Sequence, residues 1–300
     1  MTIRVAINGF GRIGRLTLRA LLERKDKQVE IVAINDLTDL KSIKHLLKYD
    51  SLHYELKNNL KIENNLIEID DKKIVFFSEK NPELIPWKEV NADLVIESTG
   101  LFASKLEAEK HLRGSVQKVL VSAPCKNADI TIVYGVNHKK LTNDHKIISN
   151  GSCTTNCLAP IVFLLEKKIG IHSGYMTTVH AVTGDQKTID TFHKDLRRAR
   201  NASLSMIPTS TGAAKAVGEV LPQLVGKLDG SAIRVPTANV SLIDFCFHAK
   251  RSTTKEGINE IIKNASSKDF KGIIEVVDEP MVSVDFNHNP HSSILDTSET

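Results

Sequence analysis

This sequence of 300 residues has few cysteines, a single tryptophan and no large excess of charge of either sign. It contains four cysteines and one tryptophan, and 40 basic side chains against 36 carboxylates leave a net charge of +4. So small a charge argues against a nucleic-acid or membrane-surface partner. Four unevenly spaced cysteines do not form a disulfide framework, so we expect free thiols in a reducing cytoplasm.

Long apolar runs, internal repeats and low-complexity segments are also missing from the sequence. No apolar run approaches the length of a membrane-spanning helix, and the first residues, MTIRVAINGFGRIGR, lack the pattern of a signal peptide. The chain is longer than one hydrophobic core usually organises. We therefore expect two domains and no membrane segment.

Short β-rich runs alternate with helical patterns through the first half of the chain. Ile3–Ile7 and Leu94–Glu97 predict strands, and Arg12–Arg24 predicts a helix. This alternation is typical of an α/β fold with an open, Rossmann-type, doubly wound parallel sheet and helices on both of its faces. A hairpin is expected at Leu66–Phe77, and Lys57–Asn65 indicates solvated turns.

The pattern changes after Cys153, where the second half of the chain begins. Helices are predicted at Thr154–Lys168 and Lys255–Ala265. The expected strands are Tyr175–Val182, Val240–His248, Ile273–Val277 and Val282–Phe286. Their alternation predicts an α+β catalytic domain with a mostly antiparallel sheet. We place the boundary near Asn150, which gives domains 1–150 and 151–300, and clefts at such junctions often hold active sites.

A glycine-rich turn separates the first predicted strand from the first predicted helix. Gly9, Gly11 and Gly14 give the pattern G-x-G-x-x-G, which allows a tight turn, close approach of backbone N–H groups to a pyrophosphate, and close helix–strand packing. Asp36 ends the second predicted strand, where a carboxylate accepts bonds from ribose hydroxyls and repels a 2′-phosphate. A helix N-cap is the alternative role for Asp36. Together these features predict NAD rather than NADP.

Two of the four cysteines lie four residues apart in SNGSCTTNC, a polar turn that leads into a predicted helix. A helix N-terminus stabilises a thiolate, so Cys153 is a candidate nucleophile, although most cysteines only pack. His180, near a predicted strand end, is the candidate acid and base, although a solitary strand histidine is more often only hydrogen-bonded. Cys157, Cys125 and Cys246 are interpreted as structural thiols.

Three features further along the chain suit phosphate binding. Arg197, Arg198 and Arg200 cluster within four positions, and guanidinium groups bind phosphate in a bidentate manner. The hydroxyl-rich segment Thr209–Lys215 begins a predicted helix, and Arg234 is a charge inside an apolar strand that needs an anionic partner. The alternatives are a solvated or subunit-contact loop and ordinary helix capping. Two separate phosphate-binding sites near a reactive thiol suggest a phosphorylated substrate and a second, inorganic phosphate.

His288 and His291 have a spacing that occurs in metal sites. Pro290 interrupts the pair, and no set of cysteine or acidic ligands accompanies it. We therefore expect no metal site.

These segments together resemble the family of phosphorylating glyceraldehyde-3-phosphate dehydrogenases. The stretches that look like its signatures are INGFGRIGR, ESTGLF, SNGSCTTNCLAP, HKDLRRAR, IPTSTGAAKA and RVPTANVS, which follow the family's order from end to end of the chain. The resemblance implies oxidation of glyceraldehyde 3-phosphate in glycolysis, with NAD and inorganic phosphate, to 1,3-bisphosphoglycerate. It also implies a cytoplasmic homotetramer with the Thr183–Met206 loop at a subunit interface.

The resemblance further implies roles for individual residues. Cys153 is expected as the nucleophile and His180 as its acid–base partner. Binding of NAD is expected at Gly9, Gly11, Arg12, Ile13, Gly14, Asp36, Lys80, Thr99 and Ser122. Binding of substrate and inorganic phosphate is expected at Ser152, Thr154, Thr183, Arg198, Thr211, Gly212 and Arg234. Arg197 and Arg200 stay open as alternatives to Arg198.

The sequence departs from the family's pattern at its end. Family members continue past a segment like Ser292–Asp296 into a further strand, a WYDNE-type motif and a C-terminal helix, whereas this sequence ends at Thr300. If no separate segment replaces these elements, we expect weaker NAD binding and lower stability. Two alternative functions stay open: erythrose-4-phosphate dehydrogenase, against which TSTGAAKA argues, and a catalytically weak binding or assembly protein on the same scaffold.

Overall fold

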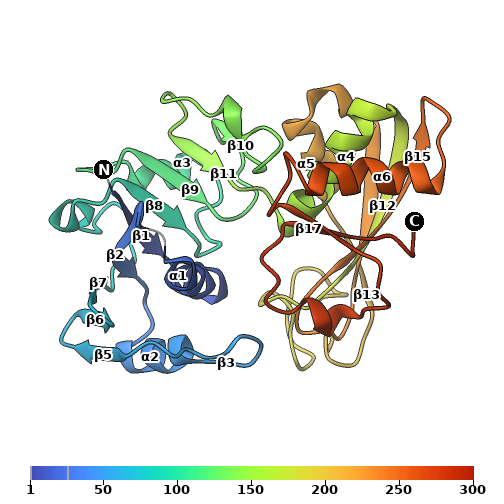
Figure 1. Cartoon of the computed structure of the whole chain (residues 1–300). Helices are drawn as coiled ribbons and strands as arrows, with labels where there is room; N and C mark the ends of the chain where they lie inside the picture. Colours follow the sequence, from blue (N-terminus) through green and yellow to red (C-terminus); the bar gives the residue numbers. More distant parts are fainter. Residues whose placement is uncertain (1, 26) are drawn as a thin grey trace. The chain divides into compact units, whose positions relative to one another are not determined.

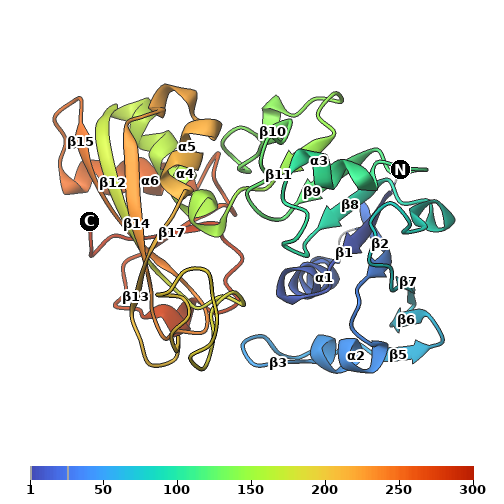
Figure 2. The same ribbon diagram turned by 180° about the vertical axis from the view of Figure 1, so that it is seen from behind.

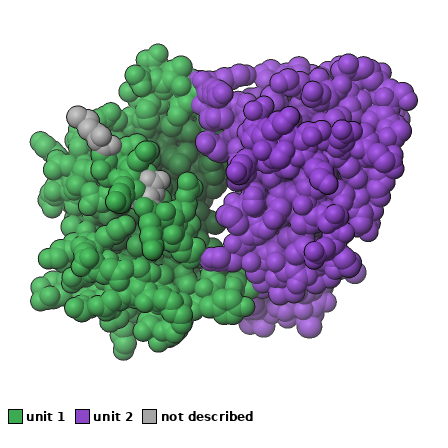
Figure 3. Space-filling view, viewed as in Figure 1, with its two compact units in different colours: residues 1–132, 141–151 green, residues 133–140, 152–300 purple. Residues whose placement is uncertain are grey.

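The computed structural model describes residues 2–25 and 27–300, which fold into two compact units (Figures 1 and 3). The first unit consists of Met1–Ile132 and Leu141–Gly151, and the second of Val133–Lys140 and Ser152–Thr300. In the described ranges, no helix is both long enough and apolar enough to cross a membrane.

The first unit is built on a nine-stranded sheet in the order β10-β11-β9-β8-β1-β2-β7-β6-β5. Its strands are β1 (Ile3–Asn8), β2 (Val29–Asn35), β5 (Leu60–Glu63), β6 (Leu66–Ile69), β7 (Lys72–Phe77), β8 (Leu94–Glu97), β9 (Lys118–Val121), β10 (Ile130–Thr131) and β11 (Ile147–Ser149). A separate hairpin joins β3 (Tyr49–Asp50) to β4 (Tyr54–Glu55). The pairs from β10 to β7 are parallel and those among β7, β6 and β5 antiparallel.

Helical segments cover both faces of this sheet. Successive side chains of β1 point to opposite faces and are buried on both. Helices α1 (Arg12–Arg24) and α2 (Leu40–Lys48) pack their apolar side chains with Val5 and Ile7 on one face. The intervening Ala6 belongs to the opposite face, where it packs with Trp87 and with Ala108 of α3 (Lys105–Ala108). Two short 3₁₀ helices, Trp87–Val90 and Glu109–His111, complete that side. The predicted Rossmann-type doubly wound sheet is confirmed.

The second unit is built on a four-stranded sheet in the order β13-β14-β12-β15, which Figure 2 shows from behind. Its strands are β12 (Ile171–His180), β13 (Ile207–Ser210), β14 (Leu228–Arg234) and β15 (Leu242–Ala249). Two of its three pairings are antiparallel, and β12 with β14 is parallel. The predicted mostly antiparallel sheet is therefore confirmed.

Three helices cover one face of this sheet: α4 (Cys153–Lys168), α5 (Ala213–Val220) and α6 (Lys255–Ser266). Leu158, Val217 and Ile262, one from each helix, pack with Met176 of β12 in a single buried core. The second unit also contains 3₁₀ helices at His138–Lys140, Pro222–Leu224 and Ser283–Phe286.

Two local predictions for the second unit are wrong. Val282–Phe286 alternates like a strand but contains the 3₁₀ helix Ser283–Phe286, because the Asp285 carboxylate accepts a 2.8 Å bond from the Val282 N–H and closes a turn. The strand predicted at Ile273–Val277 exists as β16 (Ile274–Val277), but it pairs in parallel with β17 (Ser293–Asp296) in a separate two-stranded sheet.

The prediction of turns at Lys57–Asn65 is wrong for the middle of the segment, Leu60–Glu63, and holds for the residues on either side. The segment contains β5, which pairs antiparallel with β6. Asn64 adopts a left-handed backbone conformation with φ of 50°, which asparagine tolerates better than most residues. Asn64 lets the chain reverse direction between β5 and β6, so the turn is shorter than the polar composition of Lys57–Asn65 indicates.

Candidate active site

The glycine turn after β1 has the shape that a dinucleotide cradle requires. Gly9 has φ of +89°, and a Cβ on it would lie 2.6 Å from the backbone nitrogen of Thr99. A Cβ on Gly14 would lie 2.3 Å from the Gly9 carbonyl oxygen, whereas one on Gly11 would meet no atom within 4 Å. The turn is therefore tightly packed on its inner side and open at Gly11, where α1 begins, so the residues present fit a bound pyrophosphate.

Asp36 follows β2 directly and faces the same turn. Its Oδ2 accepts a 2.6 Å bond from the Phe10 N–H, and its Oδ1 accepts a 2.8 Å bond from the Thr38 N–H. These bonds hold the carboxylate beside the glycine turn, where a ribose hydroxyl can donate to it. The helix α2 is capped by Asp39 instead, whose side chain accepts from the Ser42 N–H.

The other residues predicted to bind NAD also belong to the first unit. Ile13 is 52% exposed in the first turn of α1, and Lys80 is exposed. The Thr99 N–H and hydroxyl donate to Glu97, and the Ser122 N–H donates 2.9 Å to the Glu97 carbonyl oxygen.

Arg12, at the start of α1, forms a 2.9 Å ion pair with Asp50. Burial opposes ionisation of Asp50, but bonds from the Leu52 and His53 N–H groups and the charge of Arg12 outweigh burial and lower its pKa to about 2. The Arg12 side chain is thus anchored to the β3–β4 hairpin.

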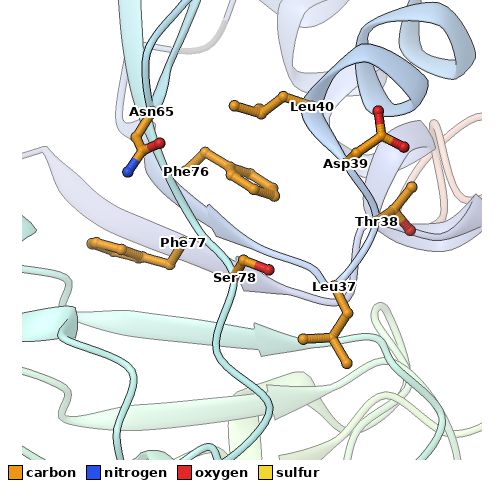
Figure 4. A pocket seen from close by; sticks show the side chains of 8 residues that line it. All are labelled: Leu37, Thr38, Asp39, Leu40, Asn65, Phe76, Phe77 and Ser78. Carbon is orange, nitrogen blue, oxygen red and sulfur yellow. The ribbon is translucent and has the colours of Figure 1, made fainter.

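A hollow of about 450 Å³ lies on the first unit directly after Asp36 (Figure 4). Its size is within the usual range for small-molecule pockets. The residues that line it come from the segment after β2, from β7 and from the turn before β6: Leu37, Thr38, Asp39, Leu40, Asn65, Phe76, Phe77 and Ser78.

Cys153 is the first residue of α4 and is exposed. Ser152 caps the helix, because its Oγ accepts a 3.1 Å bond from the Thr155 N–H. The Cys153 Sγ lies 3.2 Å from Nε2 of His180, the last residue of β12. The structure thus brings together two predicted residues that lie 27 positions apart in the sequence.

The pKa of the Cys153 thiol is lowered from its ordinary value. Desolvation raises this pKa, but the hydrogen bond with His180, the charge of His180 and the contacts with Thr154 together outweigh it. Burial raises the pKa of Cys157, which lies one turn further along α4 and whose Sγ is 3.7 Å from the hydroxyl of Ser293 in β17. The two cysteines are therefore chemically unequal, and only Cys153 is prepared as a nucleophile.

Strand register brings a guanidinium group to the other side of His180. Arg234 ends β14 and is the parallel partner of His180 across β12 and β14. The His180 Nδ1 lies 2.7 Å from the Ala181 carbonyl oxygen and 2.6 Å from Nη1 of Arg234. One nitrogen cannot both donate to the carbonyl and accept from the guanidinium, so these contacts correspond to two tautomers. When Nδ1 donates to Ala181, Nε2 is free to take a proton.

A second arginine adds to the positive charge of this region. Arg198 donates to the Thr209 hydroxyl from Nε (3.1 Å) and from Nη2 (2.8 Å), and to Asp185 from Nη1 (2.9 Å). Burial, and then the charge of Arg198, lower the pKa of Arg234. Arg197 is exposed, and the exposed Arg200 pairs with Asp190. Of the three clustered arginines, Arg198 is the one whose charge acts on Arg234.

The remaining residues predicted to bind substrate lie in the second unit as well. Thr154 is buried in the first turn of α4. Thr183 is exposed in the loop after β12. The Thr211 hydroxyl accepts from the N–H of Ala213, where α5 begins, and Gly212 lies between them as the N-cap. Within the described residues, no group of three or more histidine, cysteine or acidic side chains is placed to hold a metal ion.

The structure also assigns importance to residues that the sequence patterns did not single out. Glu97 and His111 are 2% and 0% exposed and hydrogen-bonded to each other beneath Thr99. The only signal in the sequence was an acidic residue at the end of an apolar strand, inside ESTGLF.

Two family models and several curated relatives match this chain. Residues 3–105 match the family described as glyceraldehyde 3-phosphate dehydrogenase, NAD binding domain, and residues 152–300 match its C-terminal domain. Curated relatives named glyceraldehyde-3-phosphate dehydrogenase include the Xanthobacter flavus protein, 54% identical over all of this chain and 90% of the relative. The protein from Zymomonas mobilis is 53% identical over the same shares, and that from Geobacillus stearothermophilus is 49% identical over 100% and 89%.

Proposed function

Because the chain belongs to the glyceraldehyde-3-phosphate dehydrogenase family, we propose that the residues around Cys153 carry out the chemistry of that family. The protein is an NAD-dependent enzyme that oxidises glyceraldehyde 3-phosphate in the presence of inorganic phosphate to 1,3-bisphosphoglycerate. Neither the family matches nor the relatives favour an erythrose-4-phosphate dehydrogenase or a non-enzymatic scaffold. The observation that carries the residue roles is the 3.2 Å contact between Cys153 and His180.

In the first half of the proposed mechanism, the Cys153 thiolate attacks the aldehyde carbon, and His180 Nε2–H gives its proton to the aldehyde oxygen, which forms a hemithioacetal. The neutral Nε2 then takes the hydroxyl proton of the hemithioacetal back as the carbon is oxidised, while Nδ1–H donates to the Ala181 carbonyl and stabilises the imidazolium. When bound, NAD supplies the acceptor for the hydride that leaves the same carbon. The product on the protein is an acyl thioester of Cys153.

In the second half, inorganic phosphate attacks the thioester carbonyl. The carbon–sulfur bond breaks, Cys153 leaves as the thiolate, and the acyl phosphate is released. The helix N-terminus and the hydrogen bond to His180 make this thiolate a good leaving group, because both stabilise its negative charge. Retaining the acyl group on sulfur keeps the oxidation energy from being lost to hydrolysis.

The two guanidinium groups are proposed to hold the two phosphates of the reaction. Arg234 and Arg198 repel each other, and an anion would relieve that repulsion. Arg198 is preferred over Arg197 and Arg200 because its Nη2 and Nε already converge on Thr209. The two phosphate-binding sites are proposed to be completed by hydroxyl and amide groups of Ser152, Thr154, Thr183, Thr211 and Gly212.

The first unit is proposed to hold the cofactor, so that the functional domains are 1–150 for NAD and 151–300 for catalysis. The pyrophosphate would approach the open backbone at Gly11, Arg12 and Ile13, with Gly9 and Gly14 shaping the turn. Asp36 would accept from the adenosine ribose, and the hollow after it is proposed for the adenine. Lys80, Thr99 and Ser122 are the further proposed contacts.

A homotetramer is proposed from the apolar side chains that this chain leaves exposed. The loop from residue 183 to 206 carries five of them, and Phe192 is 90% exposed. The five are Ile189, Phe192, Leu196, Leu204 and Met206. Tyr175 and Leu242 add to them on the sheet face that α4, α5 and α6 leave uncovered. Apolar surface on this scale is usually covered by a partner, and a second copy of the chain is the partner we propose.

The assembly is tested by the mass of the particle in solution. Light scattering after gel filtration is expected to give four times the chain mass, and Phe192→Glu with Leu196→Glu is expected to reduce it. A monomeric wild type would contradict the proposal. We also propose a cytoplasmic location, because the reactive Cys153 thiol needs a reducing compartment.

The catalytic roles are tested by NADH production from glyceraldehyde 3-phosphate, NAD and phosphate. Cys153→Ser is expected to lower kcat by roughly 10³-fold or more, since serine is a far weaker nucleophile at neutral pH. Cys246→Ser, which changes an exposed thiol in β15, is the matched control and should retain wild-type turnover. Activity that survives the Cys153 change, or turnover independent of phosphate, would refute the mechanism.

A further inference from the structure

Three buried polar side chains stand in one row at the carboxyl end of the first unit's sheet. The register pairs Asn8, at the end of β1, with Asn35 at the end of β2 and with Glu97 at the end of β8. Their exposed fractions are 2%, 4% and 2%. The loops that directly follow them contain the glycine turn, Asp36 and Thr99, which are all proposed NAD contacts.

The carboxylate of Glu97 joins two of these loops. Its Oε1 accepts from the backbone N–H (2.8 Å) and from the hydroxyl (2.5 Å) of Thr99. Its Oε2 accepts from Nδ2 of Asn8 (2.6 Å) and from Nε2 of His111 (3.1 Å). Four bonds use the whole acceptor capacity of a carboxylate, so Glu97 is fully satisfied without a cationic side chain among these four contacts.

The protonation of His111 follows from its other contact. Its Nδ1 lies 3.2 Å from Nε1 of Trp87, and an indole N–H can only donate. Nδ1 must therefore carry the lone pair and Nε2 the proton, which is directed at Glu97. The Asn8 Nδ2 atom, 3.4 Å from the same Nε2, is a second donor and makes no bond to it. Trp87 thus fixes the tautomer in which His111 Nε2–H donates to the Glu97 carboxylate.

Asn35 extends the network to a third segment. Its Nδ2 donates to Asn8 Oδ1 (2.8 Å) and to the Glu79 carbonyl oxygen (2.9 Å), while its Oδ1 accepts from the Glu79 N–H (2.9 Å). Glu79 immediately precedes Lys80, another proposed NAD contact. Every loop in this part of the proposed cofactor site is therefore tied to the same buried row.

We infer that Glu97, supported by Asn8, His111 and Trp87, is a positioning residue that holds the cofactor loops in their binding geometry without touching NAD. Gly9 packs so closely on Thr99 that a Cβ would come within 2.7 Å of its backbone, so a shift of Thr99 displaces the glycine turn as well. Residues behind a binding site commonly set its precision in this way. The inference rests on the proposed cofactor roles of Gly9, Asp36 and Thr99.

Glu97→Gln tests this role, because it keeps the shape of the side chain but turns one acceptor into a donor. The NAD dissociation constant, measured by calorimetry, is expected to rise about tenfold (about 1.4 kcal/mol), with kcat at saturating NAD and the KM for glyceraldehyde 3-phosphate within twofold of wild type. Asp93→Asn is the matched control, since Asp93 precedes the same strand and its carboxylate accepts from the Arg4 N–H. The control should lose stability without losing NAD affinity. Unchanged NAD affinity in folded Glu97→Gln would overturn the inference.

Trp87→Phe provides a second variant in case Glu97→Gln does not fold, because it removes the indole donor to His111 and leaves Glu97 itself unchanged, although it also reduces packing in the core. A two- to threefold rise in the NAD dissociation constant is expected, and an unchanged value would count against the network. Nitrogen-15 spectra of the wild type, without NAD, should find His111 neutral with its proton on Nε2. A proton on Nδ1, or a doubly protonated ring, would overturn the assignment.

Asp36→Ala separates failure of this inference from failure of the proposed cofactor site. If the site is correct and the network is not, Asp36→Ala weakens NAD binding while Glu97→Gln leaves it unchanged. If both variants bind NAD as the wild type does, the proposed site itself is wrong, and the inference falls with it.

Discussion

The two functional regions of this chain differ in how completely their polar groups are paired. At the carboxyl end of the first unit's sheet, Glu97 receives four hydrogen bonds and Asn35 uses both ends of its amide. In the second unit, Arg234 carries a buried Nε without a hydrogen-bond partner among the described residues, and the charge of Arg198 acts against it. The cofactor region is preassembled, whereas in the catalytic region a guanidinium N–H of Arg234 stays unpaired among those residues, and a phosphate oxygen can bond to it.

The two regions also differ in how they arise along the chain. The glycine turn is a local feature, because its glycines lie within residues 9–14, between the end of β1 and the first turn of α1. The catalytic region depends on register, because β12 and β14 must pair correctly to bring His180 beside Arg234. Changes in the second unit should therefore affect turnover most, and changes in the first should affect cofactor affinity.

After Cys153→Ser, His180→Asn is expected to give the largest effect. Loss of the acid–base group should lower kcat by about 10²- to 10⁴-fold with little change in the KM for NAD. His172→Asn, at the exposed start of the same strand, is the control.

The same variant should change how Cys153 titrates. His180 is a cause of the lowered pKa of Cys153, so its removal should move the midpoint of the pH–alkylation profile upward. A midpoint that stays in place would mean that the contact between the two residues does not stabilise the thiolate.

Arg234→Ala is expected to have the next largest effect. Losing charge-assisted hydrogen bonds to an anion costs about 1.5–3 kcal/mol, so the KM for inorganic phosphate should rise roughly 10- to 150-fold. NAD affinity should stay within twofold, which initial rates and calorimetry can establish. Arg251→Ala, an exposed arginine of the same unit, serves as the control. Equal phosphate dependence in both variants would remove Arg234 from the phosphate site.

Asp36→Ala should act on the cofactor alone. The KM for NAD is expected to rise about tenfold, because a charged acceptor for the ribose is lost. Turnover with NADP should increase, because the carboxylate no longer repels the 2′-phosphate. Asp71→Ala, in the exposed turn before β7, is the control. A fall in kcat with unchanged NAD affinity would contradict the division of roles between the two units.

Asp50→Asn is expected to give the smallest effect, a loss of stability above about pH 4 that disappears in acid. The pKa of Asp50 is about 2 in the folded chain and 3.8 as its reference value. Its contribution is therefore fully present above about pH 4 and is lost as the pH falls through about 2. The gain is about 1 kcal/mol, because Arg12 is partly exposed and solvent screens the pair. The free energy of unfolding at about pH 7, measured by denaturant titration with circular dichroism, should be lower in Asp50→Asn than in the wild type, and the difference should shrink toward about pH 2. Equal values at about pH 7 would refute the claim.

Local patterns predicted much of the first unit. The helix Arg12–Arg24 has strong apolar periodicity, and α1 occupies the predicted bounds. The strand Leu94–Glu97 also has its predicted bounds. Errors arose where side-chain bonds override periodicity, as when Asp285 closes a 3₁₀ turn in an alternating stretch. No propensity at Val282–Phe286 could have revealed that bond.

The candidate site was predictable to a different extent. The positions of Cys153 and His180 followed from a helix start and a strand end, which are local signals. The tautomer of His111 and the four bonds of Glu97 depend on Trp87 and Asn8, which are 24 and 89 residues away from their partners. Contacts of this kind follow only from the assembled sheet.

The covalent mechanism, with its acyl thioester on Cys153, is tested most directly by trapping the acyl group on the protein. Incubation with glyceraldehyde 3-phosphate and NAD in the absence of phosphate, followed by mass spectrometry with fragmentation, should find one phosphoglyceroyl group on Cys153. Addition of phosphate should remove it and release the acyl phosphate. NADH formation without an adduct, or an adduct on Cys157 in place of Cys153, would contradict the account.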